Sequence, residues 1–215
     1  RNILDKMGIK ELNPMQEEAQ SVISINPEIV LLSPTGTGKT LAFLLPLIAQ
    51  LDIDCREIQS LIVVPSRELA LQIEQVIREM GTGFKANAVY GGRAGSKDKI
   101  DLKHRPAILI GTPGRIADHL RRESFVTDDL KTLILDEFDK SLEIGFESEM
   151  KEIINALDGL TKKILTSATQ HVELPGFIGM KNPITLNYLT DGVPKLEVKT
   201  ILSPKKDKLK TLLKT

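Results

Sequence analysis

The amino-acid sequence predicts an α/β fold with an open, mainly parallel sheet and helices on both of its faces. Short runs rich in Ile, Val and Leu alternate along the chain with longer amphipathic stretches, and this alternation is typical of βαβ units. The short runs are almost continuously apolar, which indicates strands buried on both faces of a parallel sheet. Ligands of such sheets bind outside the carboxyl ends of the strands, so we expect the functional residues at that edge.

Each expected element follows from its local pattern. Short β-branched runs followed by turns are the expected strands, at residues 28–33, 59–64, 85–90, 107–112, 131–136, 162–167 and 184–186. Amphipathic stretches before or between them are the expected helices, at residues 14–25, 39–51, 67–80, 114–122 and 147–157. The first helix has Asn13 as its N-cap, Pro14 at its first position and Gln16 three residues after the cap. These residues predict a capping box.

Length and composition restrict the class of protein. With 215 residues, of which 41% are apolar and 27% charged, the chain has the size and composition of one globular domain with part of a second. The longest apolar run, at 41–49, contains Pro46 and is about half as long as a bilayer-spanning helix, so we expect no membrane contact. The single cysteine, Cys55, cannot form an internal disulfide, which suits a reducing, cytoplasmic setting.

The two ends of the chain indicate a fragment of a longer protein. The first residue is Arg1 rather than Met, and no secretory leader follows it. Lys+Arg and Asp+Glu both total 29, yet residues 195–215 carry seven Lys against Glu197 and Asp207. We interpret this basic segment as an extended linker that leads into a truncated helix. The expected organisation is one domain at 1–203 and the start of a linker or second domain at 204–215, in a monomeric fragment.

Residues 33–40 have the composition and position of a phosphate-binding loop. They read Ser-Pro-Thr-Gly-Thr-Gly-Lys-Thr, follow an expected strand and open an expected helix. Glycines let successive N–H groups turn toward phosphate oxygens, and the helix N-terminus adds favourable partial charge. Lys39 would reach the β- and γ-phosphates, and Thr40 would bind Mg²⁺ through its hydroxyl. The alternative is a turn that only connects strand and helix. The predicted nucleotide-binding residues of this loop are Thr35, Gly36, Thr37, Gly38, Lys39 and Thr40.

An acidic segment ends a later strand. Asp136 closes the apolar run at 131–136, and Glu137 follows it directly. Asp136 would hold Mg²⁺, partly through water, while Glu137 would polarise the attacking water. Alone, such residues are often only helix caps. Together with the phosphate loop they predict a nucleotide hydrolase whose catalytic residues are Lys39, Asp136 and Glu137.

The order and spacing of these motifs resemble the DEAD-box RNA helicases. Asp136-Glu137-Phe138-Asp139 is similar to motif II of that family, and Ser167-Ala168-Thr169 is similar to its motif III. Further segments resemble the family's Pro-Thr-Arg-Glu-Leu-Ala, double-glycine and Thr-Pro-Gly-Arg motifs, at 65–70, 91–92 and 112–115. The resemblance implies the N-terminal RecA-like lobe, which has a three-layer P-loop NTPase fold with a mainly parallel central sheet. It also implies ATP and Mg²⁺ as cofactors.

The segment 8–16 is similar to the Q motif of this family, whose glutamine recognises adenine. Gln16 is the matching residue, although a glutamine there can also serve the helix alone, as part of its capping box. Asn13 stands where the family usually has Thr, and Phe138 where it normally has Ala. A ring at Phe138 must find room between the acidic residues on either side. The resemblance implies that motif III couples nucleotide state to the second lobe, although on the residues alone Ser-Ala-Thr is the end of a strand. The residues implied in this coupling are Asp139, Ser167 and Thr169.

The resemblance also implies RNA as a partner, bound through its phosphate backbone. An enzyme that opens arbitrary duplexes must not read base sequence. The implied contact residues offer N–H groups, hydroxyls or guanidinium groups near helix starts or after strands. Taken singly, each is more often a helix cap or a solvated arginine. The residues are Pro65, Ser66, Arg67, Gly91, Gly92, Arg93, Thr112, Pro113, Gly114 and Arg115.

We therefore expect the ATP-binding lobe of an ATP-dependent RNA helicase, which couples ATP hydrolysis to RNA duplex unwinding or ribonucleoprotein remodelling. A second RecA-like lobe would supply the arginine finger, so the isolated lobe is expected to be a weak ATPase or inactive. Two alternatives stay open. A DNA helicase of the same superfamily is disfavoured by the Q-like segment and by residues 65–70. A non-catalytic, nucleotide-regulated RNA-binding module is disfavoured by the intact phosphate loop and acidic pair.

Overall fold

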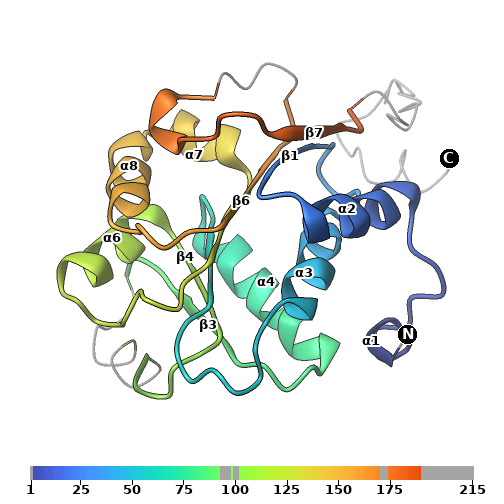
Figure 1. Ribbon diagram of the computed structural model, residues 1–215, viewed down its shortest axis with the longest axis horizontal. Coiled ribbons are helices and arrows are strands. Elements are labelled where there is room, and N and C mark those ends of the chain that lie inside the picture. Colours follow the sequence, from blue (N-terminus) through green and yellow to red (C-terminus); the bar gives the residue numbers. More distant parts are fainter. Residues whose placement is uncertain (1, 93–97, 99–101, 170–173, 190–215) are drawn as a thin grey trace, which may run out of the picture.

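Seven parallel strands form a single sheet at the centre of the molecule (Figure 1). The computed structural model describes residues 2–92, 98, 102–169 and 174–189. Within these residues the strand order is β3-β4-β2-β5-β6-β1-β7, and every neighbouring pair is parallel. The predicted α/β fold with a mainly parallel sheet is confirmed. The strands are β1 (Glu28–Leu32), β2 (Ser60–Val63), β3 (Ala86–Val89), β4 (Ile108–Gly111), β5 (Thr132–Leu135), β6 (Lys162–Ser167) and β7 (Ile184–Asn187).

Helices cover both faces of the sheet, so the described chain has three layers (Figure 1). One face carries α2 (Pro14–Ile25), α3 (Lys39–Ala49) and α4 (Arg67–Met80), with α1 (Asn2–Lys6) against α4. The other face carries α6 (Pro113–Arg121), α7 (Phe138–Ile144) and α8 (Glu147–Asn155). A 3-10 turn, η1 (Gly176–Ile178), packs near α8. The predicted strands agree with the structure within one residue at each end, and the predicted helices within two.

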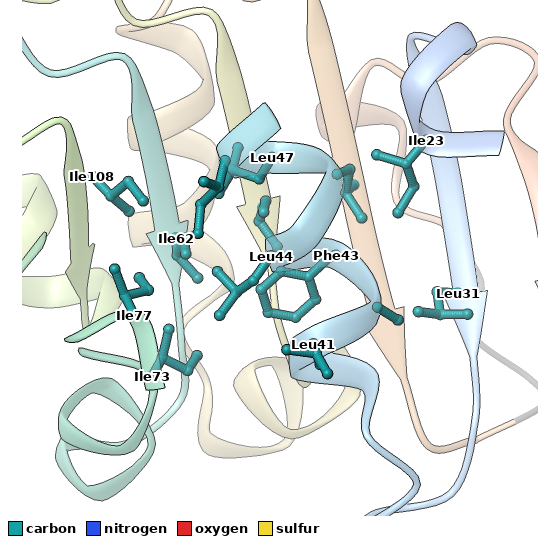
Figure 2. Close-up of a cluster of buried hydrophobic side chains, with 14 of the residues drawn as sticks. Ile23, Leu31, Leu41, Phe43, Leu44, Leu47, Ile62, Ile73, Ile77 and Ile108 are labelled. Carbon is teal, nitrogen blue, oxygen red and sulfur yellow. The ribbon is translucent and has the colours of Figure 1, made fainter. Parts of the chain in front are cut away.

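The two faces of strands β1 to β6 supply two separate apolar cores. On the face of α2, α3 and α4, Phe43 and Leu44 of α3 fill the space between Ile62 of β2 and Leu31 of β1 (Figure 2). On the other face, Leu133 and Leu135 of β5 belong to a cluster with residues of α6, α7 and α8. Alternate residues of one strand thus enter different cores, which explains why the strands are apolar at nearly every position.

Two of the helices, α2 and α4, begin at residues whose side chains cap them through local hydrogen bonds. The predicted capping box is present: the Asn13 side chain accepts from the Gln16 N–H at 2.9 Å, and the Gln16 side chain accepts from the Asn13 N–H at 3.0 Å. Helix α4 starts with Ser66, whose hydroxyl accepts from the Leu69 N–H at 3.2 Å. Helices α3 and α7, which follow the phosphate loop and the acidic segment, begin instead at Gly38 and Glu137, which have left-handed backbone angles and give no side-chain cap.

Among the described elements, three short ones were not predicted, namely α1, α7 and η1. The predicted boundary at 203–204 and the basic segment 195–215 lie outside the described residues. No helix in the described part of the chain is long and apolar enough to cross a bilayer.

Candidate functional site

The sheet order divides the carboxyl edge into two halves. Strands β5, β6 and β1 are adjacent, so the acidic segment, the Ser-Ala-Thr segment and the phosphate loop lie together in one half. Strands β2, β4 and β3 form the other half, which carries segments 65–67, 112–115 and 91–92. The structure therefore separates the residues predicted for nucleotide from those predicted for RNA. The one exception is Arg93, which lies outside the described residues.

The phosphate loop joins β1 to α3 and is held by bonds within itself. Gly36 and Gly38 have φ angles of +81° and +88°, which L side chains rarely adopt. The Lys39 ammonium donates to the carbonyl oxygens of Ser33 at 2.5 Å and Pro34 at 3.4 Å. The Thr37 hydroxyl donates to the Pro34 carbonyl at 2.8 Å. A phosphate bound here would replace these carbonyl oxygens as the hydrogen-bond acceptor of Lys39.

The start of helix α2 is hydrogen-bonded to the phosphate loop. The Asn13 amide donates to the Thr37 carbonyl at 3.0 Å, and the Gln16 amide donates to the Gly38 carbonyl at 3.3 Å. A Cβ atom at Gly38 would lie 2.4 Å from Gln16 Nε2, so only glycine allows this contact. Gln16 keeps one amide hydrogen and one carbonyl lone pair beyond its described contacts with Asn13 and Gly38.

The acidic segment turns sharply at Glu137. This residue has left-handed backbone angles, φ 49° and ψ 50°, which cost a non-glycine residue of order 1–3 kcal/mol. Its N–H donates to the Thr166 hydroxyl at 3.1 Å, and Thr166 donates to Asp136 Oδ1 at 2.5 Å. Burial raises the pKa of Asp136 to about 6, against the opposing effect of the Thr166 hydrogen bond. Burial likewise lowers the pKa of Lys39, against the opposing charges of the nearby carboxylates.

The loop, the acidic segment and Gln16 surround one pocket of about 400 Å³. The predicted residues that line it are Gln16, Thr35, Gly36, Gly38, Lys39, Thr40, Asp136 and Glu137. Its remaining wall comes from residues that the sequence analysis did not identify. These are Met7, Ile9, Leu41, Leu69, Gln72 and Val76. Leu69, Gln72 and Val76 lie at helical spacing along α4, next to its buried residues Ala70, Ile73 and Ile77, and this spacing was the available signal.

The pocket offers oxygen ligands of the kind that Mg²⁺ prefers. Thr40, with a hydroxyl, and Asp136, with a carboxylate, both line it. Magnesium in nucleotide sites is usually held by one or two carboxylates together with phosphate oxygens and water. The described residues include no group of three or more His, Cys, Asp or Glu side chains that could hold a metal. The donor set fits a metal that arrives with its nucleotide.

Comparison with known proteins identifies the family. A sequence profile described as "DEAD/DEAH box helicase" matches residues 13–175, which include the whole pocket apart from Met7 and Ile9. The chain belongs to the DEAD/DEAH box helicase family. It is 35% identical over 187 residues to the ATP-dependent RNA helicase CshA of Limosilactobacillus reuteri, covering 85% of this chain and 38% of that protein. It is 36% identical over 168 residues to CshA of Listeria monocytogenes, covering 77% of this chain and 32% of that protein.

Solved structures of DEAD-box proteins have the same fold. A DEAD box protein from the hyperthermophile Methanococcus jannaschii matches with a TM-score of 0.74 and 32% identity, over 79% of this chain and 47% of that one. A hypothetical ATP-dependent RNA helicase from Sulfolobus tokodaii matches with a TM-score of 0.77 and 26% identity, over 86% of this chain and 55% of that one. The RecA-like fold expected from the DEAD-box motifs is thus confirmed. The chain spans about a third of the length of the CshA relatives that it matches.

In the DEAD-box motif II of this chain, the phenylalanine packs away from the nucleotide pocket. Phe138 is fully buried in the core beside α6 and α8, on the opposite face of the sheet from the phosphate loop. Asp139 meanwhile accepts from the Ala168 N–H at 3.2 Å, and the Ser167 and Thr169 hydroxyls lie 3.2 Å apart. Motifs II and III therefore touch, as their proposed coupling requires. That coupling itself stays a prediction.

The half of the edge predicted to bind RNA presents its two described arginines differently. Arg67 is exposed and its guanidinium lies 5.3 Å from the centre of the Tyr90 ring. Arg115 is mostly buried and donates from Nε to Asp98 Oδ2 at 2.7 Å and from Nη1 to Asp118 Oδ2 at 3.2 Å. Arg67 is thus the more accessible of the two. The other described residues of this half, including exposed Gly91 and Gly92, follow the ends of strands β2, β3 and β4.

Asp136→Asn is expected to stabilise the ligand-free chain at neutral pH by up to about 3 kcal/mol. Because the folded pKa of about 6 exceeds the ordinary 3.8, the folded state binds the proton of Asp136 more tightly than the unfolded state does. The contribution of Asp136 to the free energy of unfolding is therefore fully present below about pH 4 and is lost as the pH rises through about 6. Asn does not ionise and escapes this loss.

Urea unfolding of both proteins in EDTA, across pH 4 to 8, measures the difference in the free energy of unfolding. The difference should grow between about pH 4 and 6 and stay constant above. A difference that does not depend on pH would contradict the raised pKa of Asp136.

Proposed function

We propose that this chain is the ATP-binding lobe of an ATP-dependent RNA helicase, and that the whole protein couples ATP hydrolysis to RNA duplex unwinding or ribonucleoprotein remodelling. The main observation behind this proposal is that Gln16, the phosphate loop and the pair Asp136 and Glu137 line one pocket. The names of the CshA relatives, which are ATP-dependent RNA helicases, support the same activity. The single cysteine supports a cytoplasmic setting.

Adenine is the base that the pocket suits. The edge of adenine presents one donor, the N6 amino group, next to one acceptor, N7, and a glutamine amide can pair with both. The amide hydrogen and lone pair that Gln16 retains match this pattern. Lys39 would turn from the loop carbonyls to the β- and γ-phosphates, and the loop N–H groups would bind their oxygens.

Hydrolysis would use the acidic segment. A bound Mg²⁺, held by Thr40 and by Asp136, partly through water, would neutralise charge on the phosphates. Glu137 would accept a proton from the attacking water. A second RecA-like lobe in the longer protein would complete the site with an arginine, so this chain alone should turn over ATP slowly.

RNA would lie across the other half of the carboxyl edge. The backbone N–H groups and hydroxyls at the ends of β2, β3 and β4, together with Arg67 and Arg115, are suited to phosphate oxygens. For Arg115 this requires that it exchange a carboxylate partner for a phosphate, or bind both at once. Because these contacts avoid base edges, binding should tolerate any sequence.

Gln16→Ala is expected to remove the preference for adenine over guanine nucleotides. Calorimetric titration of the chain with Mg-ADP and with Mg-GDP gives the ratio of the two affinities. Asn13→Ala is the matched control, because it removes the same capping box but leaves the Gln16 side chain. Each variant should lose about 1 kcal/mol of stability from the cap. An unchanged ratio in Gln16→Ala, or a wild-type chain that binds both nucleotides equally, would remove the adenine assignment.

Arg67→Ala is expected to weaken single-strand RNA binding similarly on unrelated sequences, and to reduce the salt dependence by about one unit of slope. We expect the same of Arg93→Ala and Arg115→Ala. Binding is measured on the two-lobed protein with a non-hydrolysable ATP analogue at several salt concentrations. Arg78→Ala is the control, since Arg78 is an exposed arginine in the last turn of the same helix, away from the carboxyl edge. Loss on one RNA sequence only would contradict backbone recognition.

A further inference from the structure

Thr166 is a buried hydroxyl directly beneath the nucleotide site. It lies on β6, one residue before Ser167, and is completely excluded from solvent. Strand β6 is hydrogen-bonded to β5 on one side and β1 on the other. Thr166 follows Ile164 by two residues, and Asp136 likewise follows Ile134 by two, so both polar residues lie on the sheet face covered by α3. No element of the resemblance to DEAD-box motifs gives this threonine a role.

The hydroxyl of Thr166 joins two groups of the acidic segment. It donates to Asp136 Oδ1 at 2.5 Å and accepts from the Glu137 N–H at 3.1 Å. The same N–H also reaches Asp136 Oδ1 at 3.2 Å. The described hydrogen bonds to the Asp136 carboxylate therefore all end on Oδ1. That leaves Oδ2 as the oxygen available to a ligand in the pocket.

We propose that Thr166 is a positioning residue for ATP hydrolysis, acting through Asp136 and Glu137; this rests on the proposed function. Its donated bond fixes the rotation of the Asp136 carboxylate and so selects the oxygen that serves the metal. Its accepted bond holds the N–H of Glu137 in the left-handed turn and so directs the Glu137 side chain. One hydroxyl thus aligns the metal ligand and the proton acceptor together.

Thr166→Val tests this assignment because valine keeps the shape of threonine and removes the hydroxyl. Calorimetry of the chain with ADP, with and without Mg²⁺, measures the gain in affinity that Mg²⁺ provides. Loss of a group that orients a metal ligand typically lowers metal affinity or activity 10- to 100-fold. We expect the gain to fall about tenfold in Thr166→Val, while ADP affinity without Mg²⁺ stays unchanged.

The catalytic consequence is measured on the two-lobed protein with saturating RNA. We expect the kcat for ATP in Thr166→Val to fall at least about tenfold. Thr166→Ser, which keeps the hydroxyl, should have a kcat and a Mg²⁺ gain close to those of the wild type. Thr132→Val is the control for loss of a buried threonine hydroxyl, because Thr132 starts β5 at the opposite edge of the sheet. It should change neither quantity.

The outcomes separate this proposal from the proposed function. A wild-type chain that binds no ADP would overturn both. If the wild type binds and hydrolyses nucleotide but Thr166→Val has normal kcat and a normal Mg²⁺ gain, only the role of Thr166 is overturned. Equal losses in Thr166→Ser and Thr166→Val would also overturn it, because the hydroxyl would then not be the active group. Should Thr166→Val unfold, Thr166→Ala takes its place with the same expected losses.

Discussion

Glu137→Gln is expected to leave ATP bound but almost unhydrolysed. A positioned general base typically contributes 10²- to 10⁴-fold to rate, and the amide of Gln cannot accept the proton of the attacking water. Gln has the shape of Glu, and the described contacts of Glu137 with Asp136 and Thr166 use its backbone N–H rather than its carboxylate. The turn and the metal ligand should therefore be preserved in the variant.

This difference is measured on the two-lobed protein with saturating RNA, as ATP turnover and as the Kd for ATP. Glu143→Gln is the matched control, since Glu143 is an exposed residue of α7, the helix that Glu137 precedes. Its turnover should equal that of the wild type. Normal turnover in Glu137→Gln would mean that another group accepts the proton. Loss of ATP binding would show instead that the carboxylate helps to form the pocket.

Phe138→Ala is expected to lower the free energy of unfolding by about 3–5 kcal/mol. The ring of Phe138 is fully buried, so its removal forfeits apolar burial and leaves a cavity between the sheet and the helices α6 and α8. Alanine is nevertheless the residue that the DEAD-box motif normally has at this position. The large loss is therefore a property of this chain's core rather than of the motif.

Urea unfolding of the ligand-free chain measures the effect of Phe138→Ala, with Phe138→Leu as a control that keeps most of the volume and should lose less. Mg-ADP affinity in the folded variant should match that of the wild type, because the ring lies on the opposite face of the sheet from the pocket. A loss below about 1 kcal/mol would show that the surrounding side chains close the cavity.

The fold was largely predictable because its strands and longer helices have local causes. Strands buried on both faces are apolar throughout. Helices α2 and α4 begin at residues whose side chains cap N–H groups only three residues later in the sequence. Helices α1 and α7 have five and seven residues, too few to be stable without tertiary contacts. Helix α7 also begins immediately after the left-handed Glu137, a conformation that nothing in the neighbouring sequence requires.

The site was predictable where one short segment carries the chemistry, as in the phosphate loop. It was not predictable where function depends on contacts between distant segments. Thr166 is 30 residues from Asp136, and a threonine in a strand gives no indication that its hydroxyl will face a carboxylate. The pairing of Arg115 with Asp98, 17 residues earlier, is equally invisible in the sequence. An arginine that looks solvated in the sequence is consequently mostly buried in the fold.

Backbone hydrogen bonds join most of the neighbouring strand ends along the carboxyl edge. Thr112 donates to Val89, Val64 to Gly111, Asp136 to Val63, and Ser33 to Ser167, all between 2.9 and 3.2 Å. Arg67 lies four residues after Val63, whose carbonyl holds the backbone of Asp136. The segments at this edge are therefore connected to one another through the backbone and are not independent loops. Because these bonds join β3 to β4, β4 to β2 and β2 to β5, we expect the distance between Arg67 and Asp136 to stay nearly constant when the lobe moves. Any large movement between a bound polymer and the acidic pair would then have to come from the lobe moving as one body.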